Sequence, residues 1–324
     1  MPMQKFRILV LAGLAFIASF IAPAQNKPIR ADWQEIALKE DSLRSYSNTI
    51  VNGRDAADRF RADSIFTRIL VRALKVNHSF YYPFDSIQTI SRLYAPDSSF
   101  RIFTWQVVRD ENMNRRHGAI QMRTDDGSLK LFALLDKTFQ IRELNDTITS
   151  PQAWVGAIYY RIIEKQSGGR KYYTLLGYDE NTIRSTKKRI EVLSFDNNGS
   201  PVFGGRFFSF EEDTARRAMQ SRFEIEFKKD ANARMQFDED LDMIIYEHLI
   251  PENNEPEKKY TYIPDGDYEG FKWKDGRWVH IEKVFHFKLK DGEAPVASPV
   301  TEDKLNINPQ GKTPAGKKGK NGSD

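Results

Sequence analysis

The stretch 100-FRIFTWQVV-108 marks the point at which the hydrophobic pattern of the chain changes. Before it, apolar residues recur at the i, i+3, i+4 spacing of an amphipathic helix. From about Ser99 onward they recur every second residue, in segments rich in β-branched and aromatic side chains, which is typical of half-buried strands. The sequence therefore predicts a mainly helical segment at 25–98 and an antiparallel β domain at 99–292.

The residues before this point predict two helices. Asp32 and Glu35 have the spacing of an N-cap and an N3 residue, and Asn52-Gly53 provides a natural break between the helices. The second predicted helix carries one apolar stripe, formed by Phe66, Ile69, Leu70, Ala73 and Leu74. Each helix is expected to bury such a stripe against a sheet.

The residues after this point predict about ten strands joined by tight turns. The strand-like segments are 100–108, 119–123, 129–135, 157–164, 171–177, 189–195, 222–228, 243–249 and 271–287, the last interrupted by a turn. The pairs that separate many of them suit hairpin turns: Asp126-Gly127, Gly168-Gly169, Asn198-Gly199 and Asp275-Gly276. We predict an α+β fold in which N-terminal helices pack on a large curved antiparallel β-meander, barrel-like or two-layered, with a propeller less favoured for lack of a fixed repeat.

The N-terminus has the three parts of a secretory signal peptide. Lys5 and Arg7 precede an apolar run of about 14 residues, and Ala22-Pro23-Ala24 then gives a cleavage site before Gln25. The run is shorter than the roughly 20 residues of a membrane-spanning helix. Residues 1–24 are therefore predicted to be removed on export, with no transmembrane segment left after cleavage.

The absence of cysteine favours a bacterial compartment, because secreted eukaryotic proteins usually form disulfides. We expect the periplasm or the cell exterior of a Gram-negative bacterium. The tripeptide Asp, Ser or Thr, then an aliphatic residue or Ala resembles the O-glycosylation acceptor of exported proteins in Bacteroidetes-type bacteria. It places candidate hydroxyls at Ser42, Ser64, Ser86, Thr147 and Thr214. The alternative is that Asp-Ser and Asp-Thr are ordinary turn or helix-capping pairs.

The charge pattern gives no support for an anionic partner. The net charge is +4, but much of the excess lies in the leader and in residues 293–324, so the chain between them is close to neutral. The segment 293–324 is rich in Lys, Pro and Gly and is predicted to be a disordered basic tail. The basic cluster at 184–189 lacks interleaved aromatic residues, so we predict no nucleic-acid binding.

The search for catalytic motifs is nearly empty. The chain has no cysteine nucleophile, no Gly-x-Ser-x-Gly elbow and no phosphate-binding glycine loop, so no cofactor is predicted. Asp238, Glu239, Asp240 and Asp242 form the densest acidic run. Paired carboxylates hydrolyse glycosides, but acidic runs are also ordinary solvated loops, and we favour the loop.

One weak zinc pattern occurs near the C-terminal end of the predicted β domain. His280, Glu282 and His286 would share one face of a regular strand. At the rise of a strand, however, the two imidazoles would lie about 20 Å apart, too far for one ion. We therefore do not expect zinc here.

One weak calcium pattern precedes it. Asp265, Asp267 and Glu269 have the alternate spacing of a calcium-binding loop and are followed by Gly270. The twelfth position is Gly276, where such a loop requires a bidentate Glu. A turn with solvated acids is the favoured interpretation.

Aromatic residues are concentrated between positions 260 and 287. Trp273 and Trp278 flank Asp275-Gly276, so they are predicted to pair across a hairpin. With Tyr268 they would form a ligand platform if exposed, or part of a sheet core if buried.

Several segments resemble a family of uncharacterised exported proteins of Bacteroidetes-type bacteria. They are 100-FRIFTW-105, 173-YTLLGYD-179, 202-VFG-204 and 262-YIPDG-266 through Trp278. The resemblance spans about Phe60 to Pro299 and implies an exported protein organised as a single unit. It implies no catalytic residues.

The functional expectation is an exported, non-catalytic envelope or extracellular protein that binds a ligand or another macromolecule, or serves a structural role. Its partner is an envelope component or ligand of unknown identity. The alternatives are a carrier that holds an apolar ligand in a half-open barrel and a carboxylate-dependent glycan hydrolase.

Overall fold

The computed structural model describes residues 30–215 and 217–285. The predicted signal peptide at 1–24 and the predicted tail at 293–324 lie outside the described residues. Two long helices come first, α1 (Arg30–Asn52) and α2 (Ala56–Leu74). The break at Asn52-Gly53 is confirmed, and the side chain of Asp55 caps α2 by accepting a hydrogen bond of 2.9 Å from the backbone N–H of Asp58. Helix α1 already includes Asp32 in its first turn, so the predicted N-cap position was wrong.

The strands form three separate sheets. The first sheet has the order β1-β2-β3-β4 and contains β1 (Ser91–Tyr94), β2 (Phe100–Asp110), β3 (Met113–Met122) and β4 (Lys130–Leu135). The second sheet has the order β11-β7-β6-β5, with β8 on β7, and contains β5 (Ile158–Ser167), β6 (Arg170–Asp179), β7 (Ser185–Phe195), β8 (Pro201–Phe203) and β11 (Arg222–Lys228).

The third sheet has the order β10-β9-β15-β14-β13-β12. Its strands are β9 (Phe208–Phe210), β10 (Arg217–Gln220), β12 (Met235–Asp238), β13 (Met243–Pro251), β14 (Tyr262–Lys274) and β15 (Arg277–Ile281). Four short 3-10 helices complete the described elements: η1 (Ser79–Tyr81), η2 (Thr138–Gln140), η3 (Pro151–Ala153) and η4 (Lys259–Thr261). All strand pairs within the sheets are antiparallel except β9 with β15.

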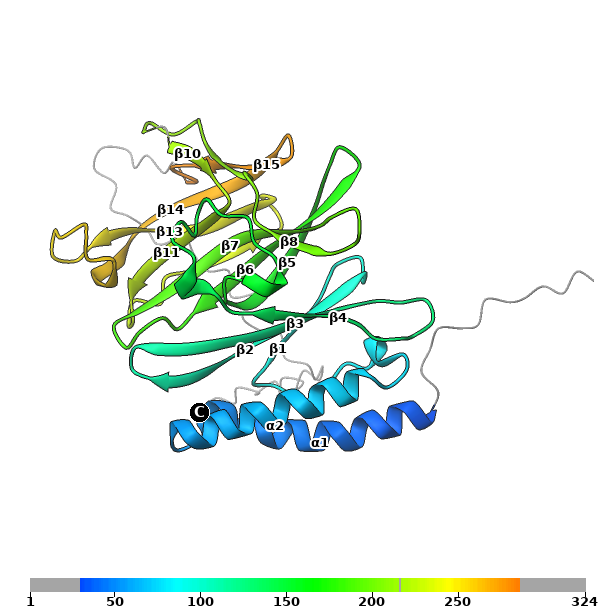
Figure 1. The fold of residues 1–324 in the computed structure, drawn as a ribbon. Coiled ribbons are helices and arrows are strands. Elements are labelled where there is room, and N and C mark those ends of the chain that lie inside the picture. The colour runs from blue at the N-terminus through cyan, green and yellow to red at the C-terminus, as the bar shows by residue number, and fades with distance from the viewer. Residues whose placement is uncertain (1–29, 216, 286–324) are drawn as a thin grey trace, which may run out of the picture. The chain divides into compact units, whose positions relative to one another are not determined.

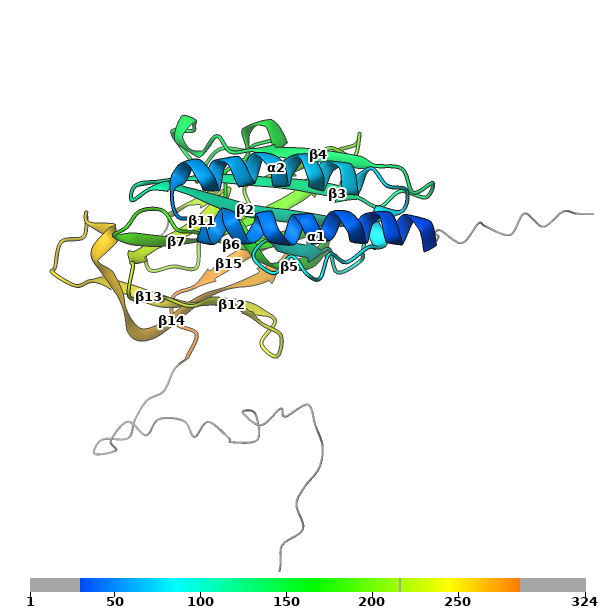
Figure 2. The ribbon, with the colours of Figure 1, turned by 90° about the horizontal axis from the view of Figure 1, so that it is seen from below.

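Helices and sheets stack in the order helix layer, first sheet, second sheet, third sheet (Figure 1). Seen from below, α1 and α2 lie side by side across the first sheet (Figure 2). Alternation along β2 explains how one sheet serves two cores, because successive side chains of a strand point to opposite faces. Phe103 and Trp105 pack with the helices, while Phe100 and Ile102 pack with the second sheet.

The second sheet is covered on both faces in the same way. In β6, Leu175 belongs to the core shared with the first sheet, and Leu176 belongs to the core shared with the third sheet. The α+β prediction is therefore confirmed, and the described strands form no closed barrel. They divide among three sheets because two of those sheets are apolar on both faces and each must be covered twice.

Two local predictions for the β14–β15 hairpin are also confirmed. Asp275 and Gly276 adopt positive φ angles of 49° and 80° in the β14–β15 turn. Trp273 and Trp278 then face each other across the hairpin, with ring centroids 5.3 Å apart.

The N-terminal segment is less purely helical than predicted. Strand β1 lies inside the stretch 25–98 that was predicted to be mainly helical. Among the described residues, no helix has the length and apolar character needed to span a bilayer.

We predict that Phe271→Ala lowers the free energy of unfolding by about 3–5 kcal/mol, because it leaves a cavity in a closely packed core. Phe271 is fully buried and contacts five aromatic rings, those of Phe208, Phe210, Phe223, Tyr246 and His280. The matched control is Phe139→Ala, because Phe139 is 74% exposed, and its loss should cost less than about 1 kcal/mol. Urea unfolding measures both values, and equal losses would contradict this account of the core.

Candidate functional site

A gap in the packing lies where β3 extends beyond the end of β4. Strand β4 pairs with β3 only from His117 to Met122, so residues 113–116 of β3 pair with β2 alone. The chain leaves the sheet at Asp136, whose carboxylate accepts hydrogen bonds from the backbone N–H of Thr138 at 3.0 Å and from its hydroxyl at 2.6 Å. This local turn starts η2 and prevents β4 from covering the edge of β3.

A cavity of about 510 Å³ occupies this gap. We call it the α2–β3 cavity. It is bounded by the start of α2, the β2–β3 hairpin and the segment after β4, through Ala56, Ala57, Phe60, Arg109, Met113, Asn114, Arg115, Asp136 and Phe139. Apolar side chains with a few fixed polar groups are the usual lining of ligand sites of this size.

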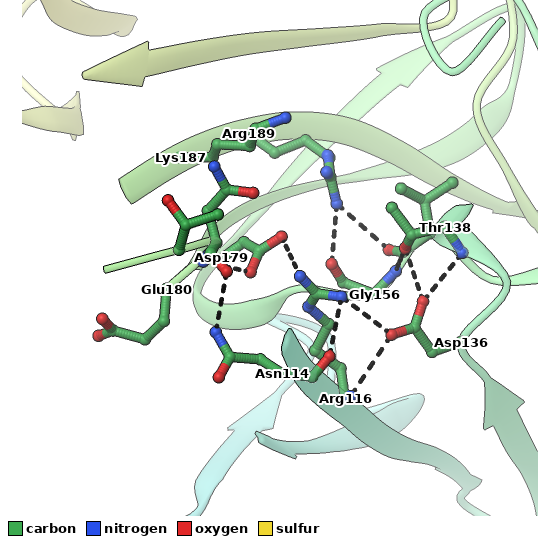
Figure 3. A network of polar contacts seen from close by, with 12 residues as sticks. Asn114, Arg116, Asp136, Thr138, Gly156, Asp179, Glu180, Lys187 and Arg189 are labelled. Atoms are coloured by element: carbon green, nitrogen blue, oxygen red, sulfur yellow. Dashed lines mark hydrogen bonds and ion pairs between the residues drawn. The ribbon is translucent and has the colours of Figure 1, made fainter. Parts of the chain in front are cut away.

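A buried ion-pair network (Figure 3) includes Asp136, which lines the cavity. Arg116 lies between two carboxylates, pairing with Asp136 at 3.2 Å and with Asp179. Its side chain is only 2% exposed. Asn114 donates a hydrogen bond of 3.3 Å to the backbone carbonyl of Asn181, which follows β6. The network thus ties the first sheet to the second sheet at the cavity.

The network continues through a close backbone approach at Gly156. Arg189 donates a hydrogen bond of 2.9 Å to the carbonyl of Gly156, whose N–H donates at 2.9 Å to the hydroxyl of Thr138 (Figure 3). A Cβ atom at position 156 would lie 2.8 Å from Cγ of Asp136 and 2.5 Å from Cδ of Arg116. Only glycine therefore fits between the ion pairs.

Two carboxyl groups of the network, those of Asp136 and Glu224, have pKa values below the ordinary value. Burial alone would raise the pKa of Asp136, but the Thr138 hydrogen bonds and the Arg116 guanidinium outweigh it and keep that pKa below its ordinary value. Burial likewise opposes ionisation of Glu224, and Arg189 with Lys187 lowers the pKa of that carboxyl. Asp136, the carboxylate in the cavity lining, is thus held in place by hydrogen bonds and an ion pair.

The residues of the weak zinc pattern do not act together. His280 is buried, with Nδ1 2.7 Å from Asp213 and Nε2 2.7 Å from the hydroxyl of Tyr246. Glu282 instead accepts hydrogen bonds from the backbone N–H and the hydroxyl of Thr214. His286 lies outside the described residues.

The residues of the weak calcium pattern all lie in β14, and each pairs with side chains outside the pattern, Asp265 and Glu269 both lying near His248. Asp265 pairs with His248 at 2.8 Å, Asp267 lies 3.4 Å from Nζ of Lys283, and Glu269 accepts from Tyr246 at 2.6 Å. Across residues 30–215 and 217–285, no group of three or more His, Asp or Glu side chains is arranged to hold a metal ion.

The acidic run forms the turn between β12 and β13. Asp238 accepts hydrogen bonds from the backbone N–H groups of Asp240 and Leu241. Two other members reach strand β5, through the ion pairs Arg161–Glu239 and Lys165–Asp242. The run therefore has the contacts of a surface turn.

The proposed aromatic platform is mostly internal. Trp278 is fully buried and donates a hydrogen bond of 2.8 Å to Thr174 in the second sheet. Trp273 is half-buried and stacks near Phe207, with ring centroids 6.5 Å apart. Tyr268 is half-buried as well. Of the two interpretations, the contacts of Trp278 agree with the sheet core.

The candidate glycosylation hydroxyls differ in accessibility. Ser42, Ser64 and Thr214 are exposed, and Thr147 is half-buried. The hydroxyl oxygen of Ser86 is buried and has no hydrogen-bond partner among the described residues. Glycosylation stays a prediction, with exposed acceptors at three of its five positions.

Sequence reasoning did not identify the α2–β3 cavity. Arg116, Asp136 and Asp179 belong to no motif and are far apart in the chain. The available signal was local, because an Asp followed two residues later by Thr at the end of a predicted strand favours a side-chain-bonded turn. Comparison with protein-family models, curated proteins and solved structures finds no match for this chain. The resemblance to exported Bacteroidetes-type proteins thus stays a prediction.

We predict that the fold loses stability in acid through these carboxylates. A lowered folded-state pKa stabilises the protein above the ordinary carboxyl pKa of about 4, and this contribution disappears as the pH falls through the folded-state value. The melting temperature should fall between about pH 5 and pH 2, and Asp136→Asn should melt lower at pH 7 and fall less steeply in acid. Glu111→Gln is the control, because the side chain of Glu111 is exposed and forms no ion pair among the described residues. Parallel pH profiles for wild type and Asp136→Asn would contradict the prediction.

Proposed function

We propose that the protein is an exported, non-catalytic binding protein that holds a small molecule with a mainly apolar body in the α2–β3 cavity. The observation that carries the proposal is the cavity itself, about 510 Å³ in volume and lined mainly by apolar side chains. A ligand seated against Ala57, Phe60 and Phe139 would gain about 25 cal/mol for each Å² of apolar surface removed from water.

The hydrogen bonds of Asp136 support a binding role rather than a catalytic one. Asp136 is the single carboxylate in the lining of the α2–β3 cavity. Oδ1 accepts from the N–H and hydroxyl of Thr138, and Oδ2 accepts from the N–H and guanidinium of Arg116. A general base needs a free acceptor site within reach of substrate, and both oxygens are already engaged.

The proposed compartment rests on the leader. Residues 1–24 combine basic residues, an apolar run and a small-x-small site, and the chain has no cysteine. Together they support export to the periplasm or cell exterior of a Gram-negative bacterium.

The proposal differs from the apolar carrier in a half-open barrel, which is one of the two alternatives that the sequence left open. The cavity lies at the edge of the first sheet, beside a helix, rather than inside a barrel. The glycan hydrolase receives no comparable support, because Glu239 and Asp242 of the acidic run form ion pairs with Arg161 and Lys165 at a turn.

We predict that Ala57→Trp weakens ligand binding by filling part of the cavity. The neutral fluorophore N-phenyl-1-naphthylamine is a suitable probe, because its fluorescence rises in apolar surroundings. Wild type should bind it saturably at one site per chain, and Ala57→Trp should weaken binding at least about tenfold. Ala57 is exposed in the first turn of α2, so the variant should fold normally, as checked by its thermal melt.

Leu38→Trp is the matched control for this experiment. Leu38 is 74% exposed on α1, and it is not part of the cavity lining. This variant should bind the probe as wild type does. Equal weakening in both variants, or the absence of saturable binding to wild type, would refute the proposed site.

We predict that the mature chain begins at Gln25. The full chain with a C-terminal tag should be recovered from the periplasmic fraction of a Gram-negative host, and its N-terminal peptide identified by mass spectrometry. Ala22→Phe should block cleavage, because the cleavage site requires small residues, while Ala18→Leu in the apolar run should not. An intact N-terminus on cytosolic wild-type protein would refute export.

A further inference from the structure

We infer that the ligand of the α2–β3 cavity is an anionic amphiphile, with an apolar body inside the cavity and a carboxylate or phosphate group held at its rim by Arg109 and Arg115. This inference rests on the proposed function and specifies its ligand class. It starts from the two guanidinium groups in the lining of the cavity, which is mainly apolar apart from them, Asn114 and Asp136.

Arg115 is an uncompensated cation. It is exposed on β3, two residues from Met113 and therefore on the same face of the strand. Its side chain forms no hydrogen bond and no ion pair with any residue that the structure describes, although Arg is the side chain best suited to pair with a carboxylate. A cation left unpaired beside an apolar cavity is available to a ligand.

Arg109 is only weakly engaged. Its Nε lies 3.8 Å from Oδ2 of Asp110, and both side chains are more than half exposed, so water screens the pair. Its Nη1 donates to the sulfur of Met113 at 3.2 Å, a weak acceptor. Most of its donors remain available to an oxyanion.

The acids around the cavity do not cancel these two charges. Asp136 in the lining pairs with Arg116 at 3.2 Å, and neither Arg109 nor Arg115 forms an ion pair with it among the described residues. Asp58, Asp110 and Glu111 are adjacent in sequence to lining residues, but they are exposed and do not line the cavity. The N-terminus of α2 adds little positive charge at the cavity, because the side chain of Asp55 already caps it.

The two parts of the site therefore require two kinds of chemistry in one ligand. The apolar lining favours a hydrocarbon chain or ring system, and the two guanidinium groups favour a group that accepts paired N–H hydrogen bonds. A neutral apolar molecule satisfies the first part alone. A cationic amphiphile meets repulsion at the rim.

The experiment compares head groups on one hydrocarbon chain. Decanoate, decyl phosphate, 1-decanol and decylamine are titrated against the full-length protein carrying N-phenyl-1-naphthylamine, and displacement gives each affinity. We expect at least one of the two anions to bind about tenfold or more tightly than decanol, and decylamine to bind most weakly. Whether decanoate or decyl phosphate binds better distinguishes the two anionic head groups.

Substitutions then test whether Arg109 and Arg115 cause the preference for an anionic head group. Arg109→Gln with Arg115→Gln should lower the ratio of anion affinity to decanol affinity about tenfold or more, and added salt should act in the same direction. Arg161→Gln is the matched control, because Arg161 is exposed and lies in the second sheet. It should change neither affinity.

Different results would overturn the proposed ligand class and the proposed function. Decanol binding as tightly as both anions, tightest binding of decylamine, or an equal loss of anion and decanol affinity in the double variant overturns the inference and leaves the cavity as an apolar site. If none of the four compounds displaces the probe, the proposed function fails and the inference falls with it.

Discussion

The ion pairs of Arg116 hold together three parts of the chain that are distant in sequence: β3, the turn after β4, and the end of β6. Removing a charge from water costs several kcal/mol, so an arginine at 2% exposure is tolerated only with close partners. Asp136 and Asp179 provide them, and loss of either would leave part of the buried guanidinium without its hydrogen-bond partner. The path of the chain around the α2–β3 cavity follows from this requirement, because Asp136 must turn inward to reach Arg116 and thereby ends β4.

In the second sheet, buried charges likewise have close partners, here across the paired strands β7 and β11. Strands β7 and β11 pair so that Arg222 faces Glu191, and Glu224 faces Arg189. The side chains of Arg222 and Glu191 are completely buried and lie 2.8 Å apart, while Arg189 donates to Glu224 at 3.0 Å. A slip of one residue would place each charge on the opposite face, among the apolar side chains of the core. These cross-strand pairs therefore fix the register of a sheet that is buried on both faces.

Local features of this fold could be predicted from the sequence because local physics determines them. Asn52-Gly53 separates the helices, and Asp275-Gly276 sets Trp273 opposite Trp278. Period-two patterns located most of the long strands, but they say only that a strand has two faces, not what covers each face. Leu175 and Leu176 are equally apolar in sequence and enter different cores, so the division into three sheets could not be predicted. The cavity was missed for a related reason, since it arises from a mismatch in the lengths of β3 and β4.

The polar groups of the cavity are of two kinds, those already hydrogen-bonded within the protein, such as Asp136, and those at the rim with donors still available, Arg109 and Arg115. This difference is the reason for the ligand chemistry that we propose. Asp136 and Arg116 already satisfy each other and are fixed before any ligand arrives, so binding incurs little ordering cost at these two residues. A polar ligand group placed there would lose its hydrogen bonds to water and find no free partner. At the rim, Arg115 is exposed and has no side-chain partner among the residues that the structure describes, so an anion can gain hydrogen bonds there without being deeply buried. The apolar part of a ligand therefore belongs inside the cavity and its charge belongs at the edge of β3.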